Sequence, residues 1–319
     1  WGLTTGLIFL FLLNFFLEDW MRTIGLQTLS RGLVAIGLLA LWRTGMVSFG
    51  HALFFGFGAY TVAMMQIGGV NDIFVLLFCG TAVAGLLALG LGFLLRQYRA
   101  IFFALLNMAF SMILYGVLAK VEALGSTDGI SISQVTFVGA KLEGETYRMA
   151  LFVIAIVFAY ISAVAAHWYL KSTLGMMTMA VRENEIRVEY LGYSAEKAIH
   201  AKYVISGLLA GMGGVIMAVT VGHVDPESMV YWTVSGDFVF ITILSGTGNV
   251  GATFIGALVY ELLRTYAFEY APEIWQLILG GSLLLIIMFL PDGLWSIRSE
   301  WRHRRAIAAS RSRKNQAAE

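Results

Sequence analysis

The chain has 319 residues, of which 59% are hydrophobic and only 13% are charged, and its formal net charge is +1. Its mean hydropathy of +0.78 indicates more apolar surface than one water-soluble core can hide. This composition excludes an ordinary soluble domain, and the near-neutral charge gives no sign of a nucleic-acid partner. The single cysteine, Cys79, excludes an internal disulfide.

Three stretches, 73–95, 100–119 and 203–222, carry no charged residue and are long enough to cross a hydrocarbon core of about 30 Å. They predict an all-α polytopic membrane protein. Apolar runs bounded by charge, glycine or proline predict about ten transmembrane or half-membrane helices, two of them short or broken by glycine. They lie near residues 3–17, 23–42, 45–67, 73–95, 100–119, 149–169, 203–221, 231–246, 251–269 and 273–290.

The distribution of basic residues predicts the orientation in the membrane. If the turn at Arg96 and Arg99 is cytoplasmic, alternation of the spans places 15 of the 21 basic residues inside. The others there are Arg43, Lys171, Arg182, Arg187, Lys197, Lys202, Arg298, Arg302, Arg304, Arg305, Arg311, Arg313 and Lys314. Only Arg22, Lys120, Lys141 and Arg148 fall outside. The positive-inside rule therefore predicts that both termini are cytoplasmic.

Two hydrophilic segments interrupt the predicted transmembrane domain, residues 1–296. A basic tail follows it at 297–319. The external loop, 120–148, contains turn signals and β-branched residues and predicts a small hairpin-like cap. The cytoplasmic segment, 170–202, predicts an amphipathic, mixed-charge helix from Arg182, ended by Gly192 and followed by a short helix capped by Ser194. Such a helix docks either on a soluble partner or on lipid headgroups.

Stretches distributed over nearly the whole chain carry a family resemblance. They include TGMVSFGHALFFGFGAY (44–60), GSTDGI (125–130), AKYVISGLLAGMGGVIMA (201–218), SGTGNVGATFIGALVYELL (245–263) and FLPDGLW (289–295). Together with the Arg182-Glu183-Asn184-Glu185 run, they resemble the permeases that import branched-chain amino acids, specifically the M-type subunit of the leucine/isoleucine/valine transport family. The family usually has small residues where Arg187 and Val188 stand, which is a departure within the coupling loop.

The resemblance implies an ATP-binding-cassette importer permease of a bacterial cytoplasmic (inner) membrane. Its implied partners are a second related permease, two cytoplasmic ATPase subunits and an external substrate-binding protein. ATP is then bound by the partner subunits, and this chain needs no cofactor. By analogy, the element that couples the permease to an ATPase consists of Arg182, Glu183, Asn184, Glu185 and Gly192.

Two glycine-rich breaks, 42–60 and 244–260, each place a turn before a helix of small residues. Transporters use such paired breaks near the midplane, although glycine is also common where transmembrane helices pack closely. The candidate pathway or gating residues are Gly45, His51, Gly56, Gly58, Asp237, Gly246, Gly248 and Gly251. A packing role is favoured for His51, and for Asp237 a helix-end cap is as plausible as contact with a substrate ammonium group.

Inside the predicted spans, Glu261 and Arg264 are three residues apart on one helical face and predict an intramembrane ion pair, favoured over substrate contact. No His, Cys or carboxylate is spaced to form a metal site with His51. The GTGNVG run at 246–251 fits G-x-G-x-x-G, but it lies between apolar spans rather than in a βαβ unit, so a nucleotide site is rejected.

The chain has no P-loop motif, so the energy source of the importer is another subunit. Competing functions are a secondary transporter, disfavoured because few carboxylates lie at mid-membrane depth, and a membrane enzyme, for which no catalytic motif is present. We therefore expect a permease that performs no bond chemistry and is not an enzyme. A permease for urea or short amides is the alternative within the same family.

Overall fold

The computed structural model describes residues 4–6, 11–12, 14, 16–246, 248–290 and 293–294. The helices are α2 (Asp19–Trp42), α3 (His51–Ile67), α4 (Ile73–Leu95), α5 (Ala100–Lys120), η1 (Glu122–Leu124), α6 (Gly144–Lys171), α7 (Thr173–Glu183), α8 (Glu185–Tyr190), α9 (Ala195–Val221), α10 (Pro226–Met229), α11 (Trp232–Ser245), α12 (Val250–Tyr270) and α13 (Trp275–Phe289). The strands are β1 (Ile130–Ser131) and β2 (His223–Val224), which pair antiparallel.

The predicted all-α polytopic membrane fold is confirmed. Among the described residues, 6 helical segments are long and apolar enough to cross a membrane: α2, α4, α5, α6, α9 and the α10–α11 segment, Pro226–Ser245. The nine predicted spans from 23–42 onward each correspond to a helix, and 73–95 matches α4 at both ends. The first predicted span, 3–17, lies partly outside the described residues, and the basic tail, 297–319, lies wholly outside them.

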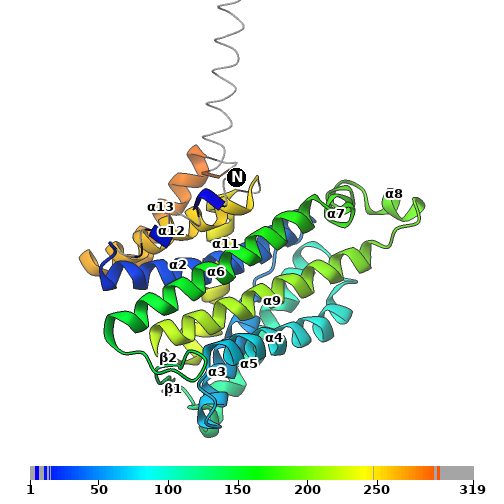
Figure 1. Cartoon of the computed structure of the whole chain (residues 1–319). Coiled ribbons are helices and arrows are strands. Elements are labelled where there is room, and N and C mark those ends of the chain that lie inside the picture. Colours follow the sequence, from blue (N-terminus) through cyan, green and yellow to red (C-terminus); the bar gives the residue numbers. More distant parts are fainter. Residues whose placement is uncertain are drawn as a thin grey trace, which may run out of the picture.

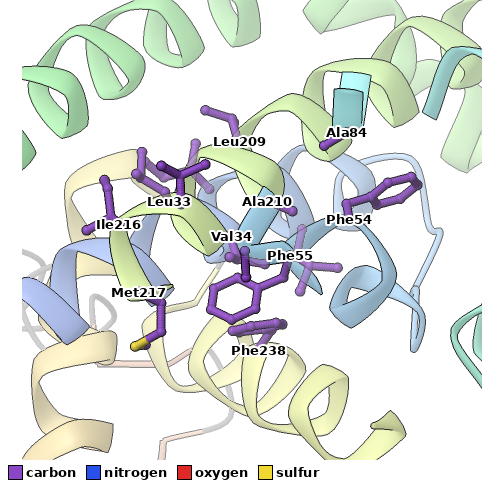
Figure 2. Close-up of a cluster of buried hydrophobic side chains, with 14 of the residues drawn as sticks. Leu33, Val34, Phe54, Phe55, Ala84, Leu209, Ala210, Ile216, Met217 and Phe238 are labelled. Carbon is purple, nitrogen blue, oxygen red and sulfur yellow. The ribbon is translucent and has the colours of Figure 1, made fainter. Parts of the chain in front are cut away.

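Helix α9 forms the centre of the bundle, where it packs against α2, α3 and α4. Small residues allow these helices to approach closely: a Cβ added to Gly58 of α3 would overlap the backbone of Gly211 of α9. Figure 2 shows the core around this contact, with Val34, Phe55 and Phe238 converging from α2, α3 and α11. The centre is therefore a rigid, fully packed unit.

Helix α5 is bound to this unit much more loosely. Of the most apolar stretch of α2, 83% is buried, whereas the corresponding value for α5 is 22%. Ile101, Phe102 and Ile113 of α5 are all more than half exposed. Because the chain spans a membrane, these side chains face lipid or another transmembrane subunit.

Two ends of the bundle are distinguished by their loops (Figure 1). One end, here the basic end, carries α7, α8, the turns at 43–50 and 96–99, and residues 246, 248 and 249. The other, here the loop end, carries residues 121–143, β1 and β2. Since α2 enters from the loop end and successive long helices alternate in direction, the predicted grouping of Arg43, Arg96, Arg99 and Arg182 at one end agrees with the fold.

Four predicted elements need correction. The span 45–67 becomes a helix only at His51, and the helix predicted at 149–169 already begins at Gly144, which shortens the external loop. The external loop does not form a local hairpin. Its strand β1 pairs instead with β2, which follows α9, so that Ile130 lies opposite Val224. The short helix expected after Ser194 is the 27-residue α9, since no glycine or proline stops it at the membrane surface.

Candidate functional site

The basic end brings the predicted coupling residues against the rest of the protein. Arg99, in the α4–α5 turn, binds Glu185 of α8 with Nη2–Oε1 and Nε–Oε2 distances of 2.5 and 2.9 Å. In the same turn, Arg96 lies 3.3 Å from Glu196 at the start of α9. These two contacts join the α4–α5 turn to α8 and to the start of α9.

The predicted helix from Arg182 to Gly192 is interrupted, because the chain forms two helices, α7 and α8, that meet at Asn184. Ser172 caps α7 by accepting a hydrogen bond from the Gly175 N–H at 3.3 Å. Asn184 adopts an extended backbone and caps α8, accepting from the Arg187 N–H at 2.9 Å. Gly192, with φ +84°, then ends α8 as predicted. The result is a bent segment with fixed ends.

The bent α7–α8 segment has internal anchors, contrary to the expectation that it lacks any packing partner. Val181 and Val188 are buried, one on each helix. The hydrogen bonds from Arg99 hold the pKa of the Glu185 carboxyl below its usual value, an effect that partial burial opposes. The segment therefore sits on the membrane domain as a defined element that can transmit force.

Its outer side carries large apolar residues as well as charges. Ile186, Tyr190 and Leu191 are 65%, 88% and 71% exposed, and Glu183 and Glu189 are also exposed. We call these five residues the coupling surface. The sequence prediction of the coupling residues did not include the apolar members, although Ile186 and Tyr190 stand four apart on the predicted amphipathic helix. Exposed apolar side chains next to charges are typical of a protein interface.

Both glycine-rich breaks meet α7 at this end. Gly45 has φ +77°, and a Cβ built on it would lie 3.2 Å from Cγ of Arg182. Gly248 lines a cavity of about 480 Å³ together with Arg43, Met179, Arg182 and Glu183. Arg182 thus lies next to both turns, which are about 200 residues apart in the sequence. In the second turn, Gly246 also has φ +77°, and the Gly251 N–H binds Asn249 Oδ1 at 3.0 Å.

The first break continues into the interior before α3 begins. The backbone of Gly50 packs against that of Asn107 in α5, and Ser48 Oγ lies 2.9 Å from Nδ1 of the fully buried His51. The Ala52 N–H binds Ser235 Oγ of α11 at 2.9 Å. Non-helical backbone is tolerated at membrane depth only where protein satisfies it, and here Ser48 Oγ accepts a hydrogen bond from the Gly50 N–H at 3.3 Å.

A cavity of about 520 Å³ lies between α3 and the loosely packed α5. Gly56, Tyr60 and Met64 line it from α3, and Leu114 and Leu118 line it from α5. Both predicted pathway glycines of α3 are closely packed: a Cβ added to Gly56 would lie 2.3 Å from Cγ2 of Val230, and one added to Gly58 would overlap Gly211 of α9. Gly56 also lines the edge of this cavity.

The predicted intramembrane pair needs a different partner. Glu261 Oε1 lies 2.6 Å from Nε of Arg31 in α2, and Asp237 Oδ2 lies 3.5 Å from Nη1 of the same arginine. Within the described part of the chain, Glu261 and Arg264 form no ion pair, and Arg264 lies over the Trp275 ring at 5.9 Å. The buried Arg31 holds both acidic residues, because α2 packs directly against α11 and α12.

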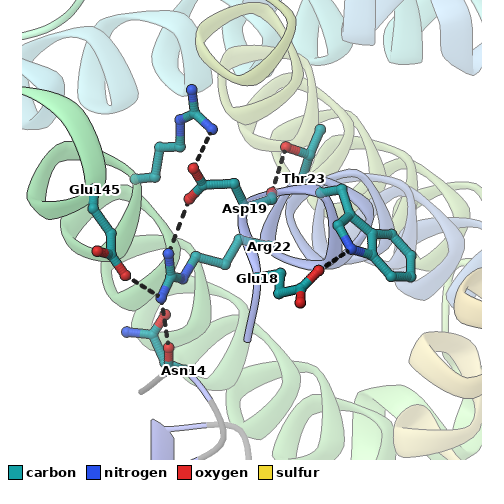
Figure 3. A network of polar contacts seen from close by, with 8 residues as sticks. Asn14, Glu18, Asp19, Arg22, Thr23 and Glu145 are labelled. Carbon is teal, nitrogen blue, oxygen red and sulfur yellow. Dashed lines mark hydrogen bonds and ion pairs between the residues drawn. The ribbon is translucent and has the colours of Figure 1, made fainter. Parts of the chain in front are cut away.

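A second charge network joins α2 and α6 at the loop end, as Figure 3 shows. The buried Arg22 lies 3.0 Å from Asp19 and 3.1 Å from Glu145. Asp19 also pairs with Arg148 at 2.7 Å. These contacts fix the start of α6 against α2 and account for two of the basic residues predicted at this end.

The family comparison matches residues 21–288 to the family described as "Branched-chain amino acid transport system / permease component". The chain belongs to this family. The high-affinity branched-chain amino acid transport system permease protein LivM of Escherichia coli is 28% identical over 306 residues, 85% of this chain and 69% of that relative. The LivM of Salmonella typhimurium is 26% identical with the same coverage.

A more distant relative is the galactofuranose transporter permease protein YtfT of Escherichia coli. It is 24% identical over 267 residues, 80% of this chain and 75% of that relative. No solved structure shows significant similarity to the chain. The chain is thus an ABC-type permease and a multi-pass membrane protein, and the named relatives are transport permeases rather than enzymes.

Proposed function

We propose that this permease is the transmembrane subunit of an ATP-driven importer that carries branched-chain or related small amino acids into the cytoplasm. The observation that carries the proposal is the coupling surface at the basic end. Its charged and apolar residues are exposed on a bent, capped segment that is anchored to the membrane helices. The substrate class follows from similarity to the two LivM permeases over 85% of the chain.

The assembly that we propose contains a second related permease, two cytoplasmic ATPase subunits and an external substrate-binding protein. ATP binds to the ATPase subunits, and this chain carries no cofactor of its own. The membrane is the bacterial cytoplasmic membrane, with the basic end and both termini inside. The clustering of basic residues at the end that carries α7–α8 supports this orientation.

In this proposal each predicted coupling residue has its own role. These residues are Arg182, Glu183, Asn184, Glu185 and Gly192. Glu183, with the apolar residues next to it, contacts the ATPase. Asn184 and Gly192 fix the shape of α8, and Glu185 transmits its displacement to the α4–α5 turn through Arg99. Arg182 contacts the first glycine-rich turn and borders the cavity at the second. Movement of the ATPase therefore reaches several transmembrane helices together.

Two helices differ in how tightly they are packed, and this difference supports a proposal for the moving part. The central helix α9 is closed against three neighbours, whereas α5 is mostly exposed and borders the 520 Å³ cavity. We propose that alternating access opens and closes the space between α3 and α5, with Gly56 on its wall. Its lining residues on α5, Leu114, Val117 and Leu118, lie in the half of that helix nearer the loop end.

The test is to reverse the charge of Glu183, which is exposed and makes no ion pair among the described residues. Glu183→Lys should leave expression and membrane insertion unchanged, because the side chain lies outside the bilayer. ATPase co-purification and amino-acid uptake should fall by about tenfold or more, since like charges brought together at an interface can cost several kcal/mol. The matched control is Glu143→Lys, an exposed glutamate at the loop end.

Wild-type ATPase association and uptake in Glu183→Lys would refute the coupling role. An equal loss in Glu143→Lys would show that charge reversal acts through general misfolding. Glu185 is unsuitable for this test, because its ion pair with Arg99 is part of the internal anchor.

A further inference from the structure

A third, smaller cavity of about 230 Å³ lies next to the interior arginines. Arg31 of α2 and Arg264 of α12 both line it, together with Gln27 and Ser228. The remaining wall is apolar and is formed by Phe55, Met217, Val221, Met229, Val234 and Phe238. A largely apolar cavity with a few convergent polar groups is the usual form of a small-molecule site.

The two arginines on this wall differ in their direct contacts with carboxylates. Arg31 has Glu261 at 2.6 Å and Asp237 at 3.5 Å, so its charge is compensated. Arg264 has no carboxylate oxygen within 4.0 Å among the described residues, and its guanidinium lies over the Trp275 ring. Arg264 is 14 residues beyond the start of α12, about 21 Å along the helix. It is therefore a cation at membrane depth with unused hydrogen-bond donors.

The chemistry of this wall specifies the ligand. A guanidinium with unused hydrogen-bond donors recognises a carboxylate, with which it can form two parallel hydrogen bonds. The aromatic and aliphatic side chains opposite accept an apolar group. The volume equals that of about eight water molecules, which suits a compact molecule rather than a peptide or a nucleotide.

We propose that this cavity is a binding site for a small aliphatic carboxylate, with Arg264 as the residue that binds the carboxylate group. Resting on the proposed function, the physiological ligand is the transported amino acid, bound through its carboxylate while its side chain contacts the apolar wall. Arg31 is a positioning residue here. It is already bound to Glu261 and Asp237, and it fixes α11 and α12 around the cavity.

The test uses the full chain in lipid nanodiscs and three probes: leucine, isocaproate, which is leucine without its amino group, and isoamylamine, which is leucine without its carboxylate. Ligand-detected saturation-transfer NMR measures binding of each probe. Leucine and isocaproate should bind and compete with each other, whereas isoamylamine should not bind. Equal or stronger binding of isoamylamine, or binding of neither carboxylate, would overturn the proposal.

Variants of Arg264 assign the site. Arg264→Gln should weaken isocaproate binding by roughly ten- to a hundredfold, as expected for losing hydrogen bonds to a charged group. Arg264→Lys keeps the charge without the planar fork and should lie between Arg264→Gln and the wild type. The control is Arg148→Gln, which removes an arginine of the loop-end network and should bind as the wild type does.

Wild-type binding of isocaproate to Arg264→Gln would overturn the assignment. Because this assay contains no ATPase, its failure leaves the Glu183 test untouched. Conversely, loss of the coupling role would leave carboxylate binding intact. The two proposals can therefore fail separately.

Discussion

Two arginine–carboxylate pairs of nearly equal length stand in opposite surroundings. In the interior, Arg31 and Glu261 lie 2.6 Å apart with 9% and 1% of their side chains exposed. At the basic end, Arg99 and Glu185 lie 2.5 Å apart with 30% and 32% exposed. Burial, and not distance, therefore determines how much each pair contributes to the stability of the fold.

For the interior pair, leaving either member alone puts an uncompensated charge in a medium that cannot solvate it. For the pair at the basic end, water solvates each member after separation, so the net gain is below about 1 kcal/mol. The interior pair therefore maintains the fold of α2, α11 and α12. The outer pair can break and re-form at little energetic expense, which suits a contact that transmits movement.

The largest effect is expected from Glu261→Gln. Arg31 would retain only Asp237, at 3.5 Å, and the chain should lose about 3 kcal/mol of stability. Denaturant unfolding of the purified chain in detergent measures this loss. Glu269→Gln, at an exposed position on the same helix, is the control and should lie close to the wild type.

Double variants separate the observed pairing from the pairing that spacing predicts. Adding Arg31→Gln to Glu261→Gln should recover part of the lost stability, because it removes the uncompensated charge. Adding Arg264→Gln should recover none of it. Recovery with Arg264→Gln, and not with Arg31→Gln, would contradict the interior pair described here.

A smaller effect is expected at the basic end, and it should depend on pH. The pKa of Glu185 is lowered by hydrogen bonds from Arg99, so the pair stabilises the docked α8 above the ordinary value of 4.5. That contribution should disappear as the pH falls from there through the lowered pKa. Hydrogen-exchange protection of residues 185–190, corrected for intrinsic rates, should fall over this range in the wild type.

Glu185→Gln should begin with the lower protection at neutral pH and show no further decrease on acidification. Glu189→Gln is the control, since Glu189 is exposed and makes no ion pair among the described residues. Unchanged protection of wild-type α8 on acidification would mean that Glu185 does not anchor it.

Local signals in the sequence were sufficient for much of the fold. The uncharged run from Ile73 to Leu95 predicted α4 at both ends, and Gly192 and Ser194 predicted the boundary between α8 and α9. The break at Asn184 was missed because the charge pattern continues through it. Its signal was the asparagine itself, which caps helices better than it continues them.

The candidate sites were harder to predict because their contacts join distant parts of the chain. Glu261 and Arg264 are close in sequence, yet the partner of Glu261 is 230 residues away on α2. Likewise, neither helix spacing nor charge counting could reveal that Arg99 binds Glu185, or that Arg264 faces a cavity. Spacing predicts which residues share a helical face, whereas packing of the helices decides what that face meets.

The central claim, that α7–α8 contacts an ATPase, is tested most directly by photo-crosslinking. A benzoylphenylalanine placed at Tyr190, which is 88% exposed, should crosslink to an ATPase subunit in membranes that contain the assembled transporter. The same residue placed at Tyr270, 80% exposed at the loop end, should give no such product. Absence of an ATPase crosslink from Tyr190, or an equal yield from Tyr270, would contradict the account.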